Sequence, residues 1–208
     1  MDKSSRQTSE INSKQLAKQN LRLKAQLLVE QLCLDQAILN EKQAQLSQQL
    51  NGFLQAQRGC WGGYRPLKKE ASPLEAMNRC SHIHWAYPRT SQNQLEFYLN
   101  PQAWKLSAHK IEEPDPDSSE FIALQNLDGF LIPGVAFDEE GHRLGRGLGF
   151  FDRALKDVPG LKVGVAWDCQ MMKDTLPTES FDVSMDVIIT NQGIVFNSLN
   201  KNERRLQK

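Results

Sequence analysis

Residues 133–155 read PGVAFDEEGHRLGRGLGFFDRAL, and the rest of the chain is organised around this segment. The apolar run at 130–132, which leads into it, predicts a short buried strand. The acidic residues and the glycine at 138–141 then predict a turn. The segment therefore begins as a strand followed by a turn, and its chemically informative residues come after that turn.

In the loop after the turn, every second residue lacks a side chain, at Gly145, Gly147 and Gly149. Because glycine allows positive φ and a close approach of the backbone to a ligand, the loop can turn several N–H groups inward. Residues 150–155 predict the first turns of a helix, whose unpaired N–H groups favour a phosphate. Arg143 and Arg146 add cations suited to phosphate oxygens. The Asp152 carboxylate stands where a magnesium ion bound to phosphates needs a ligand.

From these residues alone, two interpretations of the loop are about equally favoured, a tight turn with exposed arginines and a phosphate site. The loop matches neither standard nucleotide fingerprint. A dinucleotide motif requires glycine where Phe150 stands, and a Walker loop requires Gly-Lys-Ser/Thr, which the chain lacks.

The run PGVAFD, a turn and then RLGRGLGFFDR resembles the signature of the 5-formyltetrahydrofolate cyclo-ligase family, whose pattern is roughly PGxxFD, a short turn and RLGxGxGYYD. The resemblance implies an enzyme that uses ATP and Mg²⁺ to convert 5-formyltetrahydrofolate to 5,10-methenyltetrahydrofolate, with release of ADP and phosphate. Two features depart from the pattern. Phe150 and Phe151 replace paired tyrosines, and Leu148 stands where the family often has Gly or Lys.

The resemblance covers roughly residues 18–196. It implies an α/β fold, a single three-layer domain with a central, mostly parallel sheet flanked by helices, of the cyclo-ligase (NagB/RpiA/CoA-transferase-like) type. We expect this domain to span 14–197. The polar residues 1–13 predict a disordered tail, and the polar and basic residues 198–208 predict a loose C-terminal tail.

Three further motifs carry roles that the resemblance implies. KQNLR at 18–22 is similar to a KxxLR-type motif whose Lys and Arg reach the nucleotide, although on residues alone Lys18 and Arg22 would form a solvated helix face. Glu70 aligns with a glutamate that binds folate. Arg65 falls at a second substrate position, where the family generally has an apolar residue. Asp182 corresponds to the magnesium ligand of an LPxExHDxxxD motif.

These observations give four sets of candidate residues. The candidate ATP-binding residues are Lys18, Arg22, Arg143, Leu144, Gly145, Arg146, Gly147, Leu148, Gly149, Phe150 and Phe151. The candidate substrate-binding residues are Arg65, Glu70, Arg146, Gly147, Leu148, Gly149 and Phe150. Arg146 and Asp152 are the catalytic candidates, and Asp152 and Asp182 are the candidate metal ligands.

Length and composition limit the alternatives. With 208 residues, 39% of them hydrophobic, the chain can bury one substantial core. The 25 basic and 25 acidic residues balance, which argues against a dedicated nucleic-acid binder. The four cysteines form no CxxC pair, so neither a zinc site nor a disulfide framework is indicated. No segment has the length of a membrane span and the N-terminus lacks a signal-peptide core, so we expect a cytoplasmic protein. The resemblance implies that it binds ATP and a reduced folate, and we expect a monomer.

Two rival hypotheses remain at this stage. Leu32, Leu39, Leu46 and Phe53 recur every seven residues, which is typical of a coiled coil with a scaffolding role, although core packing explains the spacing equally well. The second rival is a diverged relative that keeps ATP but acts on another acceptor or has lost activity. Leu148, Arg65 and the two phenylalanines motivate it.

Overall fold

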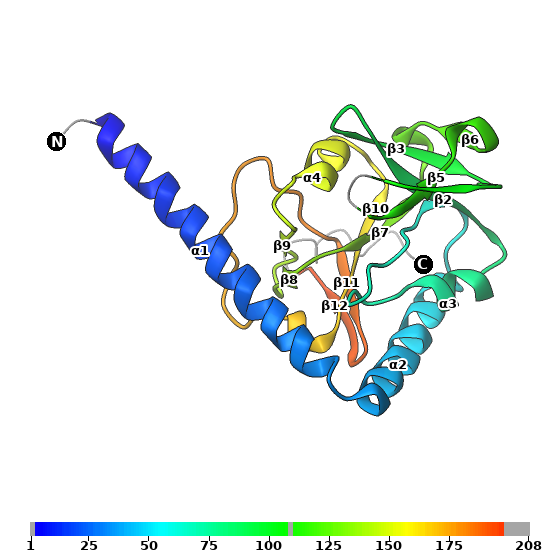
Figure 1. The fold of residues 1–208 in the computed structure, drawn as a ribbon, viewed down its shortest axis with the longest axis horizontal. Helices are drawn as coiled ribbons and strands as arrows, with labels where there is room; N and C mark the ends of the chain where they lie inside the picture. The colour runs from blue at the N-terminus through cyan, green and yellow to red at the C-terminus, as the bar shows by residue number, and fades with distance from the viewer. Residues whose placement is uncertain (1–2, 108–109, 198–208) are drawn as a thin grey trace.

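The computed structural model describes residues 3–107 and 110–197. Within these ranges the strands form one eight-stranded sheet in the order β12-β11-β10-β7-β1-β2-β3-β6 (Figure 1). From one edge to the other, the bounds are β12 Gly193–Phe196, β11 Val187–Thr190, β10 Leu161–Val165, β7 Gly129–Pro133, β1 Gly59–Gly62, β2 Ile83–Ser91, β3 Gln94–Leu99 and β6 Glu120–Ile122. The five inner strands from β11 to β2 pair in parallel, and β12, β3 and β6 pair antiparallel at the edges. The expected central, mostly parallel sheet is confirmed.

Strand β7 shows why the sheet is covered on both faces. All of residues 129–132 are buried, as expected for a central parallel strand with layers above and below. Successive side chains of a strand point to opposite faces. Accordingly Leu131 belongs to one hydrophobic cluster, whereas Phe130 and Ile132 belong to another.

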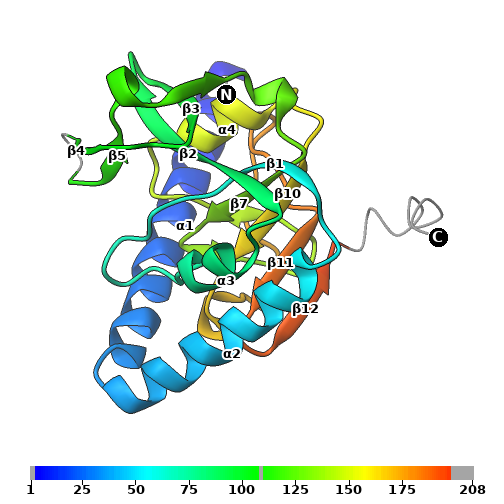
Figure 2. The same ribbon diagram turned by 90° about the vertical axis from the view of Figure 1, so that its right-hand side faces the viewer.

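Helices α1 Lys3–Leu32, α2 Gln36–Leu54 and α3 Leu74–Arg79 lie on the Leu131 side of the sheet. Figure 2 shows α2 and α3 running along this face. The Asp35 side chain caps α2 by accepting hydrogen bonds from the backbone N–H groups of Ala37 and Ile38, which sets where the helix begins. Leu46, Leu50 and Leu54 are then fully buried against the sheet.

The other face is covered by α4 Phe150–Leu155 and by the loops around it. Leu155 packs with Phe97, Phe130 and Phe137 in the second cluster. Two small sheets complete the fold, β4 Trp104–Leu106 with β5 Glu112–Pro114, and β8 Ala136–Phe137 with β9 Arg143–Leu144. Three short 3₁₀ segments connect strands, namely η1 Pro116–Ser118, η2 Leu124–Asn126 and η3 Asp168–Gln170. Helices therefore flank the sheet on both faces, which gives the expected three layers.

The leucine heptad run lies within this domain. A turn between Leu32 and Gln36 divides the run between α1 and α2. Leu46 is fully buried, and Leu32, Leu39 and Phe53 pack against the core on the same face of the sheet. Core packing therefore explains the run, and a coiled-coil seam is not its role.

The N-terminal helix is longer than the sequence predicts. It begins at Lys3, so residues 3–13 are helical where we expected a disordered tail. The segment contains neither glycine nor proline, and extending an existing helix costs much less than starting one. Its first turns extend beyond the sheet (Figure 1). The expected C-terminal tail at 198–208 lies outside the described residues. No helix in the described ranges combines the length and the apolar character that a membrane span requires.

Candidate active site

The glycine-rich loop lies at the carboxyl end of β7, where the chain leaves the centre of the sheet through the β8–β9 hairpin. This edge is where open α/β sheets bind their ligands. Gly147 and Gly149 have φ values of +100° and +65°, in the left-handed region that other residues adopt only with strain. The glycines are therefore needed for the path of the loop, as the sequence predicted.

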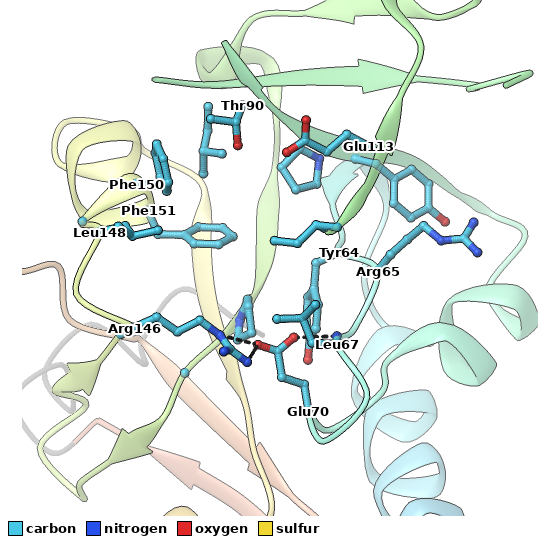
Figure 3. Close-up of a pocket in the computed structure, with 18 of the residues that line it drawn as sticks. Tyr64, Arg65, Leu67, Glu70, Thr90, Glu113, Arg146, Leu148, Phe150 and Phe151 are labelled. Atoms are coloured by element: carbon cyan, nitrogen blue, oxygen red, sulfur yellow. Dashed lines mark hydrogen bonds and ion pairs between the residues drawn. The ribbon is translucent and has the colours of Figure 1, made fainter. Parts of the chain in front are cut away.

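A cavity of about 350 Å³ opens beside this loop (Figure 3). Ten of the predicted site residues line it: Arg65, Glu70, Arg143, Gly145, Arg146, Leu148, Gly149, Phe150, Phe151 and Asp152. Its other walls come from β2, β5 and the segment that follows β1. The structure thus brings together residues that lie almost ninety positions apart in the sequence.

Arg146 and Glu70 meet at the mouth of the cavity. The Arg146 Nη2 and Nε atoms donate to Glu70 Oε1 at 2.8 and 3.1 Å, as the dashed lines in Figure 3 show. Glu70 Oε2 also accepts from the backbone N–H of Leu67 at 2.9 Å. The Arg146 side chain is 51% exposed, so this ion pair contributes little stability and can open at little cost.

The loop that carries Glu70 is anchored from both sides. The Tyr64 hydroxyl donates to the Ala71 carbonyl at 2.6 Å, and Trp167 Nε1 donates to the Lys69 carbonyl at 3.2 Å. Burial, with a smaller effect from the nearby Glu70 carboxylate, raises the pKa of Tyr64 well above its usual value. The phenol therefore stays neutral and keeps its donor role. Glu70 is held at the cavity by a fixed backbone.

Arg143 is buried deeper and paired with Asp152. Its Nη2 donates to Asp152 Oδ1 at 2.8 Å, and Nη1 donates to the Pro133 carbonyl at 3.3 Å. The Arg143 side chain is only 4% exposed, and its Nε has no hydrogen-bond partner within the described part of the chain. Asp152 Oδ1 also accepts from the backbone N–H of Val183 at 3.3 Å. That contact brings Asp152 next to the segment that contains Asp182.

Asp182, the second predicted metal ligand, lies in a separate ion cluster. Lys18 Nζ donates to both Asp182 Oδ2 and Glu179 Oε2 at 2.7 Å. Burial lowers the pKa of Lys18, but the hydrogen bonds to Asp182 and Glu179, with their charges, outweigh it, so the pKa lies above the usual 10.5. Lys18 therefore stays charged and fastens α1 to the 179–182 segment.

The remaining predicted residues lie behind the loop and do not belong to the cavity lining of the described structure. Arg22 Nε donates to the Gly145 carbonyl at 2.9 Å, and a Cβ on Gly147 would lie 3.7 Å from the Arg22 guanidinium. The Leu144 side chain is buried in a third cluster with Ala25 of α1. Arg22 thus supports the loop from α1, and Leu144 can face a ligand only through its backbone.

The sequence profile of the 5-formyltetrahydrofolate cyclo-ligase family matches residues 14–191. The chain belongs to this family.

Curated relatives and solved structures agree with the profile. The 5-formyltetrahydrofolate cyclo-ligase of Escherichia coli K12 is 38% identical over 108 residues, 50% of this chain and 59% of the relative. The Haemophilus influenzae cyclo-ligase is 38% identical over 44% of this chain and 51% of its own. The alignments thus span little more than half the length of these relatives.

The structure of Aquifex aeolicus 5,10-methenyltetrahydrofolate synthetase superposes with a TM-score of 0.72 at 29% identity, covering 87% of this chain and 93% of that one. The Mycoplasma pneumoniae synthetase gives a TM-score of 0.66 at 23% identity and covers 84% and 98% of the two chains, which supports the fold. The cyclo-ligase α/β domain is therefore the fold of this chain.

Arg65 has a different environment from the one that the family pattern suggests. Its Nη2 pairs with Glu112 at 2.7 Å, and its guanidinium lies 4.4 Å from the centroid of the Trp104 ring. These contacts hold the arginine at the rim, where the family generally has an apolar residue. Arg89 on β2 stabilises the β4–β5 hairpin, because its Nη1 donates to the Pro114 carbonyl at 3.0 Å.

Several cavity residues were not among the sequence candidates. They are Tyr64, Leu67, Tyr87, Pro88, Thr90, Leu95, Ile111, Glu112, Glu113, Pro133 and Gly134. Most sit on strands or at strand ends, where a buried apolar or aromatic residue has no pattern that separates a cavity wall from ordinary core.

Proposed function

We propose that this chain is an ATP- and Mg²⁺-dependent 5-formyltetrahydrofolate cyclo-ligase, which forms 5,10-methenyltetrahydrofolate, ADP and phosphate. The observation that carries the proposal is the cavity between the glycine-rich loop and Glu70. It brings predicted phosphate-binding and folate-binding residues to one site. Membership of the family supports the same activity.

The walls of the cavity suit a flat, partly apolar ring system. Aromatic side chains line it at Tyr64, Tyr87, Phe150 and Phe151, and a volume of about 350 Å³ is within the usual range for small-molecule sites. Rings of this kind stack on a pterin or a benzoyl group. The ring system of a reduced folate is such a ligand.

The cations of the site suit the phosphates of ATP. Arg143 and Arg146 reach the cavity, and Arg22 lies directly behind the loop. Guanidinium groups and inward N–H groups of a glycine-rich loop can bind phosphate oxygens together. Arg146 is the exposed cation of this group, so it can turn from Glu70 to a phosphate with a small energetic cost.

Asp152 and Asp182 have the oxygen donors that Mg²⁺ prefers. Among the described residues, three or more metal-binding side chains do not gather in one place. That agrees with a magnesium ion held by one or two carboxylates and by the phosphates it accompanies. The ion would supply positive charge to the phosphate oxygens. Arg143 and Lys18 already pair with the two carboxylates, so a magnesium ion would have to share these carboxylates with the two cations.

The reaction needs positioning and charge stabilisation more than a nucleophilic side chain. The formyl oxygen of the folate attacks the γ-phosphorus, and the bond to the leaving ADP oxygen breaks. The neighbouring N10 then attacks the formyl carbon, loses its proton, and phosphate leaves. Arg146 and the loop N–H groups are placed to neutralise charge that develops on the phosphoryl oxygens.

Mixing the purified protein with 5-formyltetrahydrofolate, ATP and Mg²⁺ tests the proposal. The near-ultraviolet absorbance of the methenyl product is followed, with ATP or Mg²⁺ omitted in parallel. A rise that requires both supports the activity. A sample that binds ATP but produces no rise would contradict it and favour the diverged relative with another acceptor. A cytoplasmic location and a monomeric state remain predictions from the sequence.

A further inference from the structure

Glu113 on β5 is a buried carboxylate that lines the cavity. The residue is 5% exposed, and in Figure 3 its side chain points into the cavity on the side of Thr90. Among the groups that the structure describes, its carboxylate has neither a hydrogen-bond partner nor an ion-pair partner, and its oxygens are open to the cavity. Glu113 is therefore an acceptor that faces the cavity without a donor.

The charges of the cavity explain why this carboxylate is left over. Three arginines and four carboxylates line the walls: Arg65, Arg143, Arg146, Glu70, Glu112, Glu113 and Asp152. The arginines form three pairs, Arg65 with Glu112 at 2.7 Å, Arg143 with Asp152 at 2.8 Å and Arg146 with Glu70 at 2.8 Å. Every arginine in the described lining thus already has a partner, and Glu113 is the unmatched group.

The neighbouring Glu112 shows that this placement is specific. Successive residues of a strand face opposite sides, so the two glutamates of β5 point in different directions. The Glu112 side chain is 53% exposed and reaches Arg65 at the rim, whereas Glu113 is turned inward. Pro88, Tyr87 and Ile111 line the same cavity and contribute mostly apolar surface.

Water in the open cavity can hydrate these oxygens when no ligand is bound, and a ligand that displaces the water must offer donors in its place to keep its affinity. Since the described protein supplies none, the group that fits is a ligand with adjacent N–H donors. Two parallel N–H bonds to one carboxylate are the strongest and most directional form of this contact.

We propose that Glu113 binds the aminopyrimidinone edge of the reduced folate through its 2-amino group and N3–H. The inference rests on the proposed function, because that function makes a reduced folate the substrate. In Figure 3, Arg146 and Glu70 lie at the other end of the cavity from Glu113. Anchoring the pyrimidine edge at Glu113 turns the N5-formyl group toward Arg146 and the glycine-rich loop. Glu113 is thus a residue that sets substrate orientation.

Binding of 5-formyltetrahydrofolate without ATP, followed by calorimetry, is the first test. We expect Glu113→Gln to weaken folate binding about 10- to 100-fold, the usual effect of losing a hydrogen bond to a charged group. ATP binding should not change. Asp117→Asn is the matched control, because it removes a nearby negative charge that is 88% exposed and outside the cavity lining. The control should bind folate like the unaltered protein.

A folate analogue that lacks the 2-amino group separates recognition from a general effect on the fold. In the unaltered protein the analogue should bind more weakly than 5-formyltetrahydrofolate, whereas Glu113→Gln should bind the two with similar affinity. Thermal unfolding gives a second readout. Since the carboxylate has no protein partner, Glu113→Gln should unfold at the same or a higher temperature than the unaltered chain.

The outcomes distinguish this inference from the proposed function. If the unaltered protein binds no reduced folate, the proposed function itself fails. If it binds folate and Glu113→Gln binds equally well, only the role of Glu113 is overturned. Equal losses for folate and for the analogue in Glu113→Gln, or a large drop in unfolding temperature, would likewise overturn it and assign the glutamate a structural role.

Discussion

Two of the three places where the described structure pairs a predicted ATP-binding cation with a carboxylate differ in what those pairs can do. At the cavity mouth, Arg146 and Glu70 form a pair whose arginine is 51% exposed. In the middle of α1, the Lys18 side chain is 9% exposed and forms ion pairs with both Asp182 and Glu179. The first pair can open for a ligand at little cost, whereas breaking the second leaves largely buried carboxylates without a counter-charge. Arg146 was predicted from the residues of the glycine-rich loop and Lys18 from the family resemblance, and their environments assign them different roles.

Replacing Arg146 should have the largest effect on turnover. We expect Arg146→Ala to lower kcat by about two to three orders of magnitude, because one well-placed charge stabiliser contributes that much. Unfolding temperature should barely move, since the lost ion pair is exposed. The methenyl-product assay and thermal unfolding measure the two effects. Arg79→Ala is the control, because that arginine forms an exposed pair with Glu75 on α3. Near-normal turnover of Arg146→Ala would remove Arg146 from the catalytic role.

Asp152→Asn should lower kcat to a similar degree, with a different signature. The change removes a carboxylate that pairs with Arg143 and that we propose as a magnesium ligand. Turnover should therefore need more Mg²⁺ to reach half its maximum, which a magnesium titration of both proteins measures. An unchanged magnesium requirement, with reduced turnover, would limit Asp152 to positioning Arg143.

Replacing Lys18 should reduce stability and activity together. Lys18→Met leaves Asp182 and Glu179 without their shared cation, and we expect a loss of about 1–3 kcal/mol in the free energy of unfolding. Turnover should fall about tenfold or more if Lys18 also binds ATP. Lys42→Met is the matched control, because Lys42 pairs with Asp168 at 2.7 Å at partial burial, outside the cavity lining. Equal loss of turnover in both variants would show that destabilisation alone explains the effect.

The same lysine predicts how stability changes with pH. Burial lowers the pKa of Lys18, but its two carboxylate partners outweigh burial and raise it above 10.5. A raised folded-state pKa contributes stability that is complete below the unfolded value and is lost as pH rises through the folded one. The difference in unfolding temperature between the unaltered chain and Lys18→Met should stay constant from neutral pH to about 10 and shrink above 10.5. A constant difference through that range would mean that the cluster does not depend on the lysine charge.

The individual elements of the fold could be predicted from the sequence, whereas their arrangement could not. The strand at 130–132, the turn, the glycine-rich loop and the helix at Phe150 follow from local patterns, and the structure has them as expected. Local patterns work here because each element is determined by its own periodicity and turn residues. The central, mostly parallel sheet was expected only from the resemblance, and the strand order was not predicted, since no local pattern specifies which strands become neighbours.

In the candidate site, likewise, individual residues could be predicted but the contacts between them could not. Arg146 and Glu70 could each be predicted to be site residues, but their contact depends on how the loop after β1 meets the loop after β7. The sequence could not reveal that Lys18 pairs with Asp182, the residue predicted to hold a metal. Nor could it separate Glu113 from Glu112, because the outcome depends on which face of β5 is turned inward. Local residue types were predictable, and the pairing of charges across the fold was not.

The smallest effect should come from restoring the tyrosine that the family pattern has at Phe150. The Phe150 ring lines the cavity and lies 5.2 Å from the Arg153 guanidinium, so its stacking surface is already in place. We expect Phe150→Tyr to change KM for the reduced folate by about two- to threefold, because the added hydroxyl must give up a hydrogen bond to water to form one with the ligand, so the net gain is small. Initial rates at varied folate concentration measure this. A hundredfold gain in kcat/KM would contradict this prediction. It would show that phenylalanine tunes this cavity away from 5-formyltetrahydrofolate, and the search for a different acceptor would then begin at the Phe150 wall.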